Sequence, residues 1–263
     1  MTTVFVSLTD AGYYPKALRT LQELRGAGNW QGDVVLICVE FDPPEEQMKD
    51  LNITVRKVNH IDHKPLWNIW SLFPIPPMAD NRHYGKVTQW DKLEVFSDYF
   101  KRWERVVFLD AGIRIVDIVQ HLLHIPWKGR FLAPDDSDPY DNGNRFKCQI
   151  HLQANPKAKE DFIKEFGSDL LERHYFLNCI FLFDTSLLNP RPAYQIMKSW
   201  MYKYPIMACN EMGLMNLYFR DVWVPFPHKI QDNSKYLFGW SELNYREKPD
   251  WKKFCFLKYP ATL

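Results

Sequence analysis

Short apolar runs alternate with amphipathic stretches along the first part of the chain. The runs at 3–8 (TVFVSL), 33–40 (DVVLICVE) and 105–110 (RVVFLD) have the length and composition of buried strands. Between the first two runs, leucines recur at every third position behind Pro15, and Gly26 follows them, which is typical of a helix. Strands joined by helices usually pair in parallel. The sequence therefore predicts an α/β fold with a mostly parallel central sheet, helices on both faces and a mixed C-terminal part.

The rest of the chain gives further expected elements and one interruption. Periodicity predicts helices at 42–51, 86–100, 156–166, 190–204 and 209–220, and strands at 53–58, 131–134 and 177–184. Residues 60–85 break the alternation, because they hold Trp67, Trp70 and Phe73 among four prolines, and we expect an ordered loop or lid there. No internal repeat or linker divides the chain, so a single domain is expected.

Composition excludes several classes of protein. Lys and Arg together number 33 and Asp and Glu 32, so no net charge would recruit nucleic acid. The five cysteines lack CxxC spacing, which favours a reducing compartment without disulfides or a structural zinc. The N-terminal segment has no signal-peptide pattern, and no run approaches the roughly 18 apolar residues of a membrane span. These features predict a soluble, cytoplasmic protein without a nucleic-acid partner.

The strand at 105–110 ends on Asp110, which is followed by Ala111 and Gly112. Such an ending suits a turn, because glycine adopts a positive φ at low cost. It also suits a ligand site, because ligands of open α/β sheets bind beyond the carboxyl ends of the strands. Two carboxylates one residue apart, after an apolar strand, are typical of sites where a divalent ion neutralises a leaving diphosphate. Here Gly112 stands at the position of the second carboxylate, and both interpretations remain open.

Other segments carry candidate ligand-binding residues. Residues 7–14 (SLTDAGYY) precede a helix start, where backbone amides favour phosphate and a tyrosine can stack on a base, although a capped turn explains the same residues. Lys92 falls on or beside the apolar stripe of the 86–100 helix, where either a phosphate partner or a snorkelling stem accounts for it. Four lysines near the end form either a cover for a diphosphate or a solvated surface: Lys248, Lys252, Lys253 and Lys258.

Taken in order, these segments resemble a known family. The chain resembles glycogenin-like glycosyltransferases of the GT-A (Rossmann-like) nucleotide-diphospho-sugar transferase fold, and it is also similar to glycosyltransferases encoded by large algal DNA viruses. The similar segments are FVSLTDAGYYPKAL, QWDKLEVFSDYFKRWERVVFLDAG, FLAPD, YFLNCIFLFD, EMGLMN and, more faintly, FCFLKYP. They span nearly the whole chain in the family's order.

The resemblance implies one glycosyltransferase domain over 1–263, with a nucleotide-binding half at 1–115 and a sugar- and acceptor-binding half at 116–263. It implies transfer of a hexose or pentose from a nucleoside-diphosphate sugar, a UDP-sugar foremost, to a glycan or glycoprotein acceptor. The aromatic segment at 60–85 is expected beside the acceptor. The residues implied to bind the nucleotide sugar are Leu8, Thr9, Tyr14, Lys92, Asp110, Ala111, Gly112 and Asn178. The implied catalytic candidates are Glu211 and Asp135, the latter also placed at the donor sugar.

The chain departs from the family at the expected metal ligands. Gly112 replaces the second metal aspartate and Cys255 the metal histidine, while Glu211 and Met212 replace an Asp-Gln pair. Asp110 is left as the metal candidate, so Mn²⁺ or Mg²⁺ is expected to bind weakly, mainly through the donor's phosphates, and no organic cofactor is expected. Two alternatives stay open: a non-catalytic nucleotide-sugar-binding protein, and a sugar nucleotidyltransferase, for which SLTDAGYY is a poor phosphate loop.

Overall fold

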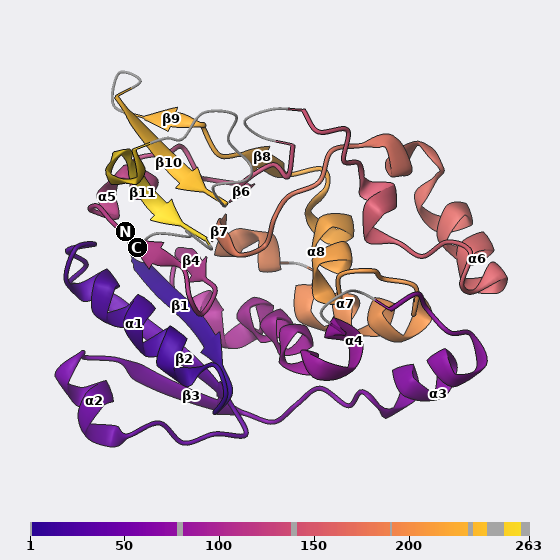
Figure 1. Cartoon of the computed structure of the whole chain (residues 1–263), viewed down its shortest axis with the longest axis horizontal. Coiled ribbons are helices and arrows are strands. Elements are labelled where there is room, and N and C mark those ends of the chain that lie inside the picture. Colours follow the sequence, from indigo (N-terminus) through magenta and orange to yellow (C-terminus); the bar gives the residue numbers. More distant parts are fainter. Residues whose placement is uncertain are drawn as a thin grey trace.

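A seven-stranded sheet runs through the middle of the molecule, as the computed structural model shows (Figure 1). The structure describes residues 2–77, 81–137, 141–189, 191–230, 234–240 and 250–258. The strand order is β3-β2-β1-β4-β7-β6-β8. The strands are β1 (Thr3–Thr9), β2 (Asp33–Val39), β3 (Thr54–Val58), β4 (Arg105–Leu109), β6 (Phe131–Ala133), β7 (Ile180–Asp184) and β8 (Trp223–Pro225).

Strand β1 occupies the position that matters most for ligand binding. It pairs in parallel with β2 on one side and with β4 on the other, where Val4 lies opposite Val106 and Val6 opposite Phe108. The chain therefore passes from β1 to β2 and β3 on one side, and later returns to form β4 on the other side of β1. The carboxyl ends of β1 and β4 meet at this topological switch point, where open α/β sheets bind ligands. The expected mostly parallel sheet is confirmed, and the later strand β7 is antiparallel to β4 and β6.

Helices cover both faces of the sheet. Since side chains alternate along β1, its residues enter the core clusters on both faces. Val4 and Val6 lie in one core cluster with Trp90, whereas Phe5 points into the other cluster with Leu21 of α1. The helices are α1 (Tyr14–Arg25), α2 (Glu45–Asp50), α3 (Lys64–Leu72), α4 (Arg82–Gly85), α5 (Gln120–Leu123), α6 (Pro156–Phe166), α7 (Ala193–Lys203) and α8 (Glu211–Phe219). None of the described helices has the length and apolarity needed to cross a membrane.

A smaller sheet brings residues 254–258 to the switch point. Its order is β5-β11-β10-β9, from β5 (Arg114–Ile115), β11 (Phe254–Leu257), β10 (Lys235–Gly239) and β9 (Lys229–Ile230). Strand β11 pairs antiparallel with β5, so that Leu257 lies opposite Arg114. Since β5 follows β4 by only a few residues, this pairing places Lys258 beside Asp110.

Two segments differ from the sequence-based expectation. Residues 86–100 form two 3-10 helices, η1 (Val87–Phe96) and η2 (Asp98–Arg102), in place of one α-helix. The apolar residues of η1 recur every three positions, which is the 3-10 period. The expected loop at 60–85 contains α3 and α4. In α3 the Trp70 ring is buried and its indole N–H donates to the carbonyl oxygen of Pro205 at 2.8 Å, whereas Trp67 is 41% exposed.

These two tryptophans of α3 allow a matched test of how the segment is docked. Trp70→Ala should lower the free energy of unfolding by about 3–5 kcal/mol, because it empties a buried site and leaves the Pro205 carbonyl without its donor. Trp67→Ala should cost less than about 1 kcal/mol, because the ring is largely exposed. Urea unfolding of both variants measures the difference. Equal losses would show that α3 is not docked through Trp70.

Candidate functional site

A cavity of about 380 Å³ opens at the carboxyl ends of β1 and β4. Its lining combines the β1–α1 turn, the segment from α4 into η1, the residues after β4, and Lys258 beyond β11. The lining residues are Leu8, Thr9, Asp10, Tyr13, Lys16, Arg19, Gly85, Lys86, Thr88, Gln89, Lys92, Asp110, Ala111, Gly112, Arg114 and Lys258. The parallel pairing of β1 and β4 explains why residues about 100 positions apart share one cavity.

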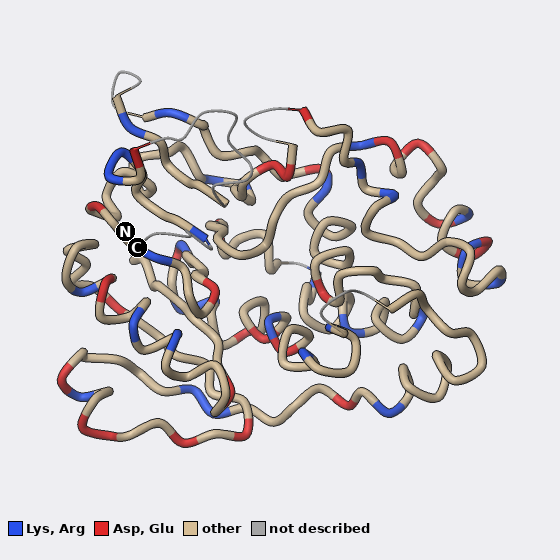
Figure 2. Tube along the Cα trace, in the orientation of Figure 1, with Lys and Arg blue, Asp and Glu red and all other residues tan. Residues whose placement is uncertain are grey.

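The cavity is more positive than the rest of the molecule. Its lining includes six Lys or Arg residues and two Asp residues. In the whole chain the two signs nearly balance, at 33 and 32, and Figure 2 shows them mixed along the trace. Such a local excess of cations attracts an anionic ligand.

Lys92 is a buried cation of the cavity, at 4% exposed. Its Nζ lies 2.9 Å from Oδ1 of Asp110 and 3.0 Å from Oε1 of Glu211, and it donates to the carbonyl oxygen of Asn178 at 3.3 Å. Burial lowers the pKa of this ammonium, but the two carboxylates raise it more, so its pKa lies above the ordinary value. Lys92 is thus a charged, buried group, which excludes the expected alternative of a snorkelling stem.

Asp110 uses both carboxylate oxygens in ion pairs. Oδ1 faces Lys92, and Oδ2 accepts from Nζ of Lys258 at 3.2 Å. Burial raises the pKa of this carboxyl, but Lys258 and Lys92 lower it more, so that it stays ionised at neutral pH. The hydrogen bond of the turn comes from the backbone, since the Ile113 N–H donates to the Asp110 carbonyl oxygen at 3.0 Å. The side chain therefore belongs to the charge cluster and not to the turn.

Glu211 and Asn178 complete this cluster. Glu211 begins α8 and is 2% exposed, and its Oε1 accepts from Nδ2 of Asn178 at 2.7 Å. Its second oxygen, Oε2, is buried without a hydrogen-bond partner among the described residues. Burial raises the pKa of Glu211, and Lys92 offsets this only in part. The structure therefore brings together four of the site residues expected from the sequence. They are Lys92 of η1, Asp110 directly after β4, Asn178 shortly before β7, and Glu211 of α8.

The other expected residues divide into two groups. Leu8, Thr9, Ala111 and Gly112 line the cavity. Tyr14 is not among the lining residues. Its hydroxyl donates to Oε1 of Gln47 at 2.5 Å and its ring lies 5.1 Å from that of Phe41, measured between centroids, while the neighbouring Tyr13 faces the cavity. No local sequence signal separates two adjacent tyrosines at the start of a helix.

Asp135 lies in a different environment from the cluster. Its Oδ2 is 2.9 Å from Nδ1 of His174, and its Oδ1 accepts from the Ser137 N–H at 2.9 Å. It is not among the residues that line the cavity. Of the four lysines near the end of the chain, Lys258 lines the cavity, and Lys248 lies outside the described residues.

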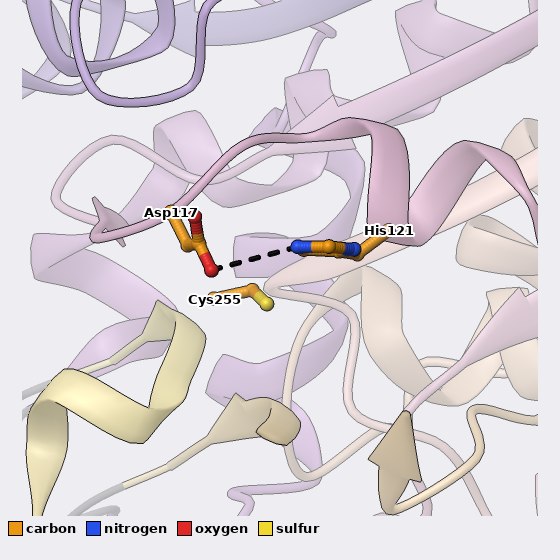
Figure 3. Close-up of side chains that lie close together, drawn as sticks. All are labelled: Asp117, His121 and Cys255. Atoms are coloured by element: carbon orange, nitrogen blue, oxygen red, sulfur yellow. Dashed lines mark ion pairs between the residues drawn. The ribbon is translucent and has the colours of Figure 1, made fainter. Parts of the chain in front are cut away.

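Cys255, expected in place of a metal histidine, lies with Asp117 and His121 (Figure 3). The three ligand atoms are within 4.8 Å of one another, and burial raises the pKa of Cys255 to about 11. Asp117 also pairs with the ammonium of Lys235, which competes with a cation for that carboxylate. None of these residues is in the described lining of the cavity, so Cys255 does not complete a metal site around Asp110.

A divalent ion is implied by the fold, but the residues around Asp110 do not fit one. Both oxygens of this carboxylate face ammonium groups, and Gly112 supplies no second carboxylate. Hard divalent cations take oxygen ligands, several of them anionic, and the two carboxylates at this position, those of Asp110 and Glu211, already share the ammonium of Lys92.

Comparison with known proteins gives a family match and several similar structures. The family model described as "Glycosyl transferase family 8" matches residues 18–245. Among curated proteins, none matches the chain significantly. The galactosyltransferase LgtC, solved with donor and acceptor sugar analogs, is similar in structure, with a TM-score of 0.59, 14% identity, and coverage of 97% of this chain and 86% of that chain.

Two fungal enzymes share the fold at lower similarity. Core-mannan synthase A from Aspergillus fumigatus, in an Mn/GDP form, gives a TM-score of 0.53 at 8% identity and covers 86% of this chain and 73% of its own. The mannosyltransferase Ktr4p from S. cerevisiae gives 0.53 at 10% identity, with coverage of 86% and 68%.

These matches confirm the GT-A fold and the expected family at its broader level. They do not distinguish glycogenin-like or viral enzymes from other members, so that part of the resemblance stays a prediction. The family model covers well over half of the chain. The chain belongs to glycosyl transferase family 8.

Proposed function

We propose that the protein transfers a sugar from a nucleoside-diphosphate donor, a UDP-sugar foremost, to a glycan or glycoprotein acceptor. The observation that carries this proposal is the cation-lined cavity at the switch point of β1 and β4. Glycosyl transfer from such a donor leaves negative charge on the departing diphosphate, and preorganised cations stabilise that charge most effectively. The family supports glycosyl transfer, and the cavity supports an anionic donor.

The lining suggests how the donor lies. Tyr13 is 37% exposed at the cavity and offers its ring to the base, a role that the sequence assigned to Tyr14. Lys92 and Lys258 face the diphosphate. Nearly all lining residues belong to 1–115, which supports the nucleotide-binding role of that half and leaves sugar and acceptor to 116–263.

Glu211 and Asn178 contact Lys92 from behind the cavity, since neither is among its described lining residues. The unpaired Oε2 of Glu211 is a buried acceptor that a sugar hydroxyl can satisfy, and Nδ2 of Asn178 holds the other oxygen in place. We assign both residues to donor-sugar orientation. Asp135 pairs with His174, whereas Glu211 and Asn178 contact Lys92, and it is therefore a less direct candidate for the reacting centre.

The activity is tested by incubating the protein with UDP- and GDP-sugars, with and without glycan acceptors. Release of nucleoside diphosphate supports glycosyl transfer. Nucleotide-sugar binding without any release would favour the non-catalytic alternative, which the altered metal ligands motivate. Release of pyrophosphate would favour a nucleotidyltransferase.

The two adjacent tyrosines provide a matched test of base binding. Tyr13→Ala should weaken UDP binding by about 1–3 kcal/mol, the usual contribution of a base stacked on an aromatic ring. Tyr14→Ala should leave UDP affinity nearly unchanged, because that ring packs on Phe41. Isothermal titration of both variants decides between them, and a larger loss for Tyr14→Ala would reverse the assignment.

Lys92 should matter both for stability and for turnover. Lys92→Met removes the cation between the buried carboxylate of Glu211 and the partly buried one of Asp110, and loss of one partner of a buried ion pair costs about 3–5 kcal/mol of unfolding free energy. Adding Glu211→Gln should restore much of this stability, because it removes one of the carboxylates left unpaired. Sugar transfer should remain strongly reduced in the double variant, because the cation is still missing and Glu211, assigned to the donor sugar, is altered as well. Full activity of a folded Lys92→Met variant would remove Lys92 from the site.

A further inference from the structure

We infer that three lysine ammonium groups, those of Lys16, Lys92 and Lys258, hold the donor diphosphate in place of a divalent metal ion, so that donor binding needs no metal. This inference rests on the proposed function, since it concerns the same cavity. It departs from the metal-dependent chemistry that two carboxylates at this position would support.

Asp110 is already paired with two lysines. Its two oxygens lie 2.9 Å and 3.2 Å from the ammonium nitrogens of Lys92 and Lys258. Both lysines are 4% exposed, so little water screens their charges. A divalent ion bound to Asp110 would have to displace these ammonium groups or lie beside them against their repulsion.

Gly112 stands where a second metal carboxylate would begin. A Cβ atom built on this residue would lie 3.6 Å from Cδ of Lys16, so the lysine stem runs past the point where a second carboxylate would begin. The Gly112 N–H donates to Oγ1 of Thr20, which fixes this turn against α1. Its φ of +94° also favours glycine over aspartate. The turn at Gly112 thus lies in van der Waals contact with the stem of a cationic side chain, and its backbone disfavours an aspartate as second metal ligand.

The charge balance of the cavity favours the same conclusion. Its lining holds six Lys or Arg residues, including Lys16, Lys92 and Lys258, against the two carboxylates of Asp10 and Asp110. The cavity is therefore cationic without a metal, and a bound diphosphate would offset that charge. Adding a divalent cation alone would increase its excess of positive charge.

The experiment is isothermal titration of UDP, GDP and inorganic pyrophosphate into the full chain, once in chelator and once with excess Mn²⁺. We expect Kd values for the bound nucleotide that agree within about twofold between the two conditions. Binding at least about tenfold tighter with Mn²⁺, or binding only with Mn²⁺, would overturn the inference and leave the proposed function standing. Absence of binding by either nucleotide in both conditions would overturn the proposed donor site itself.

Lysine variants test the same point separately. Lys258→Met and Lys16→Met should each weaken UDP binding in chelator by about tenfold, because each removes a cation that faces the diphosphate. Lys252→Met is the matched control, since Lys252 is exposed and is not among the lining residues. Unchanged affinity in both Lys258→Met and Lys16→Met, with circular dichroism showing folded protein, would contradict the inference.

Gly112 offers a second matched pair. Gly112→Asp and Gly112→Asn share the backbone strain at positive φ, but only aspartate adds a carboxylate. In chelator, Gly112→Asp should bind UDP at least about tenfold more weakly than Gly112→Asn, and Mn²⁺ should restore part of that loss. Equal affinity of the two variants in chelator would contradict the lysine cluster as the diphosphate site.

Discussion

The buried ammonium of Lys92 is the interaction on which the site depends. A charge at this depth is tolerated only when paired and hydrogen-bonded, and its partners come from three distant parts of the chain: Asp110 after β4, Glu211 at the start of α8, and the carbonyl of Asn178 before β7. Each partner lies beside or within a strand or helix that packs in the core. The cluster therefore ties the nucleotide-binding strands to the later half of the chain.

The fold could be predicted in outline, because it follows from local periodicity. The apolar runs of β1, β2 and β4 and the leucine spacing of α1 are local signals, and the structure confirms them. The apolar residues of η1 also give a local signal, a three-residue spacing, although an α-helix is predicted from it. The helix α3 was missed because four prolines around it suggested a loop, whereas Pro65 lies in the first turn, where a helix tolerates it.

The site could be predicted only in part, since its geometry depends on long-range pairing. Asp110 and Lys92 stood out as a carboxylate at a strand end and a lysine on an apolar stripe. The proximity of Lys258 to Asp110 required the pairing of β11 with β5, which no local pattern encodes. The choice between Tyr13 and Tyr14 depended on how α1 begins, and the pairing of Asp135 with His174 joins segments 39 residues apart.

The most direct test of this account is a crystal structure of the protein with UDP. The account predicts the diphosphate within hydrogen-bonding distance of Nζ of Lys92 or Lys258 at the ends of β1 and β4, with the base against Tyr13. UDP bound away from this cavity, or with its diphosphate turned away from both lysines, would contradict it.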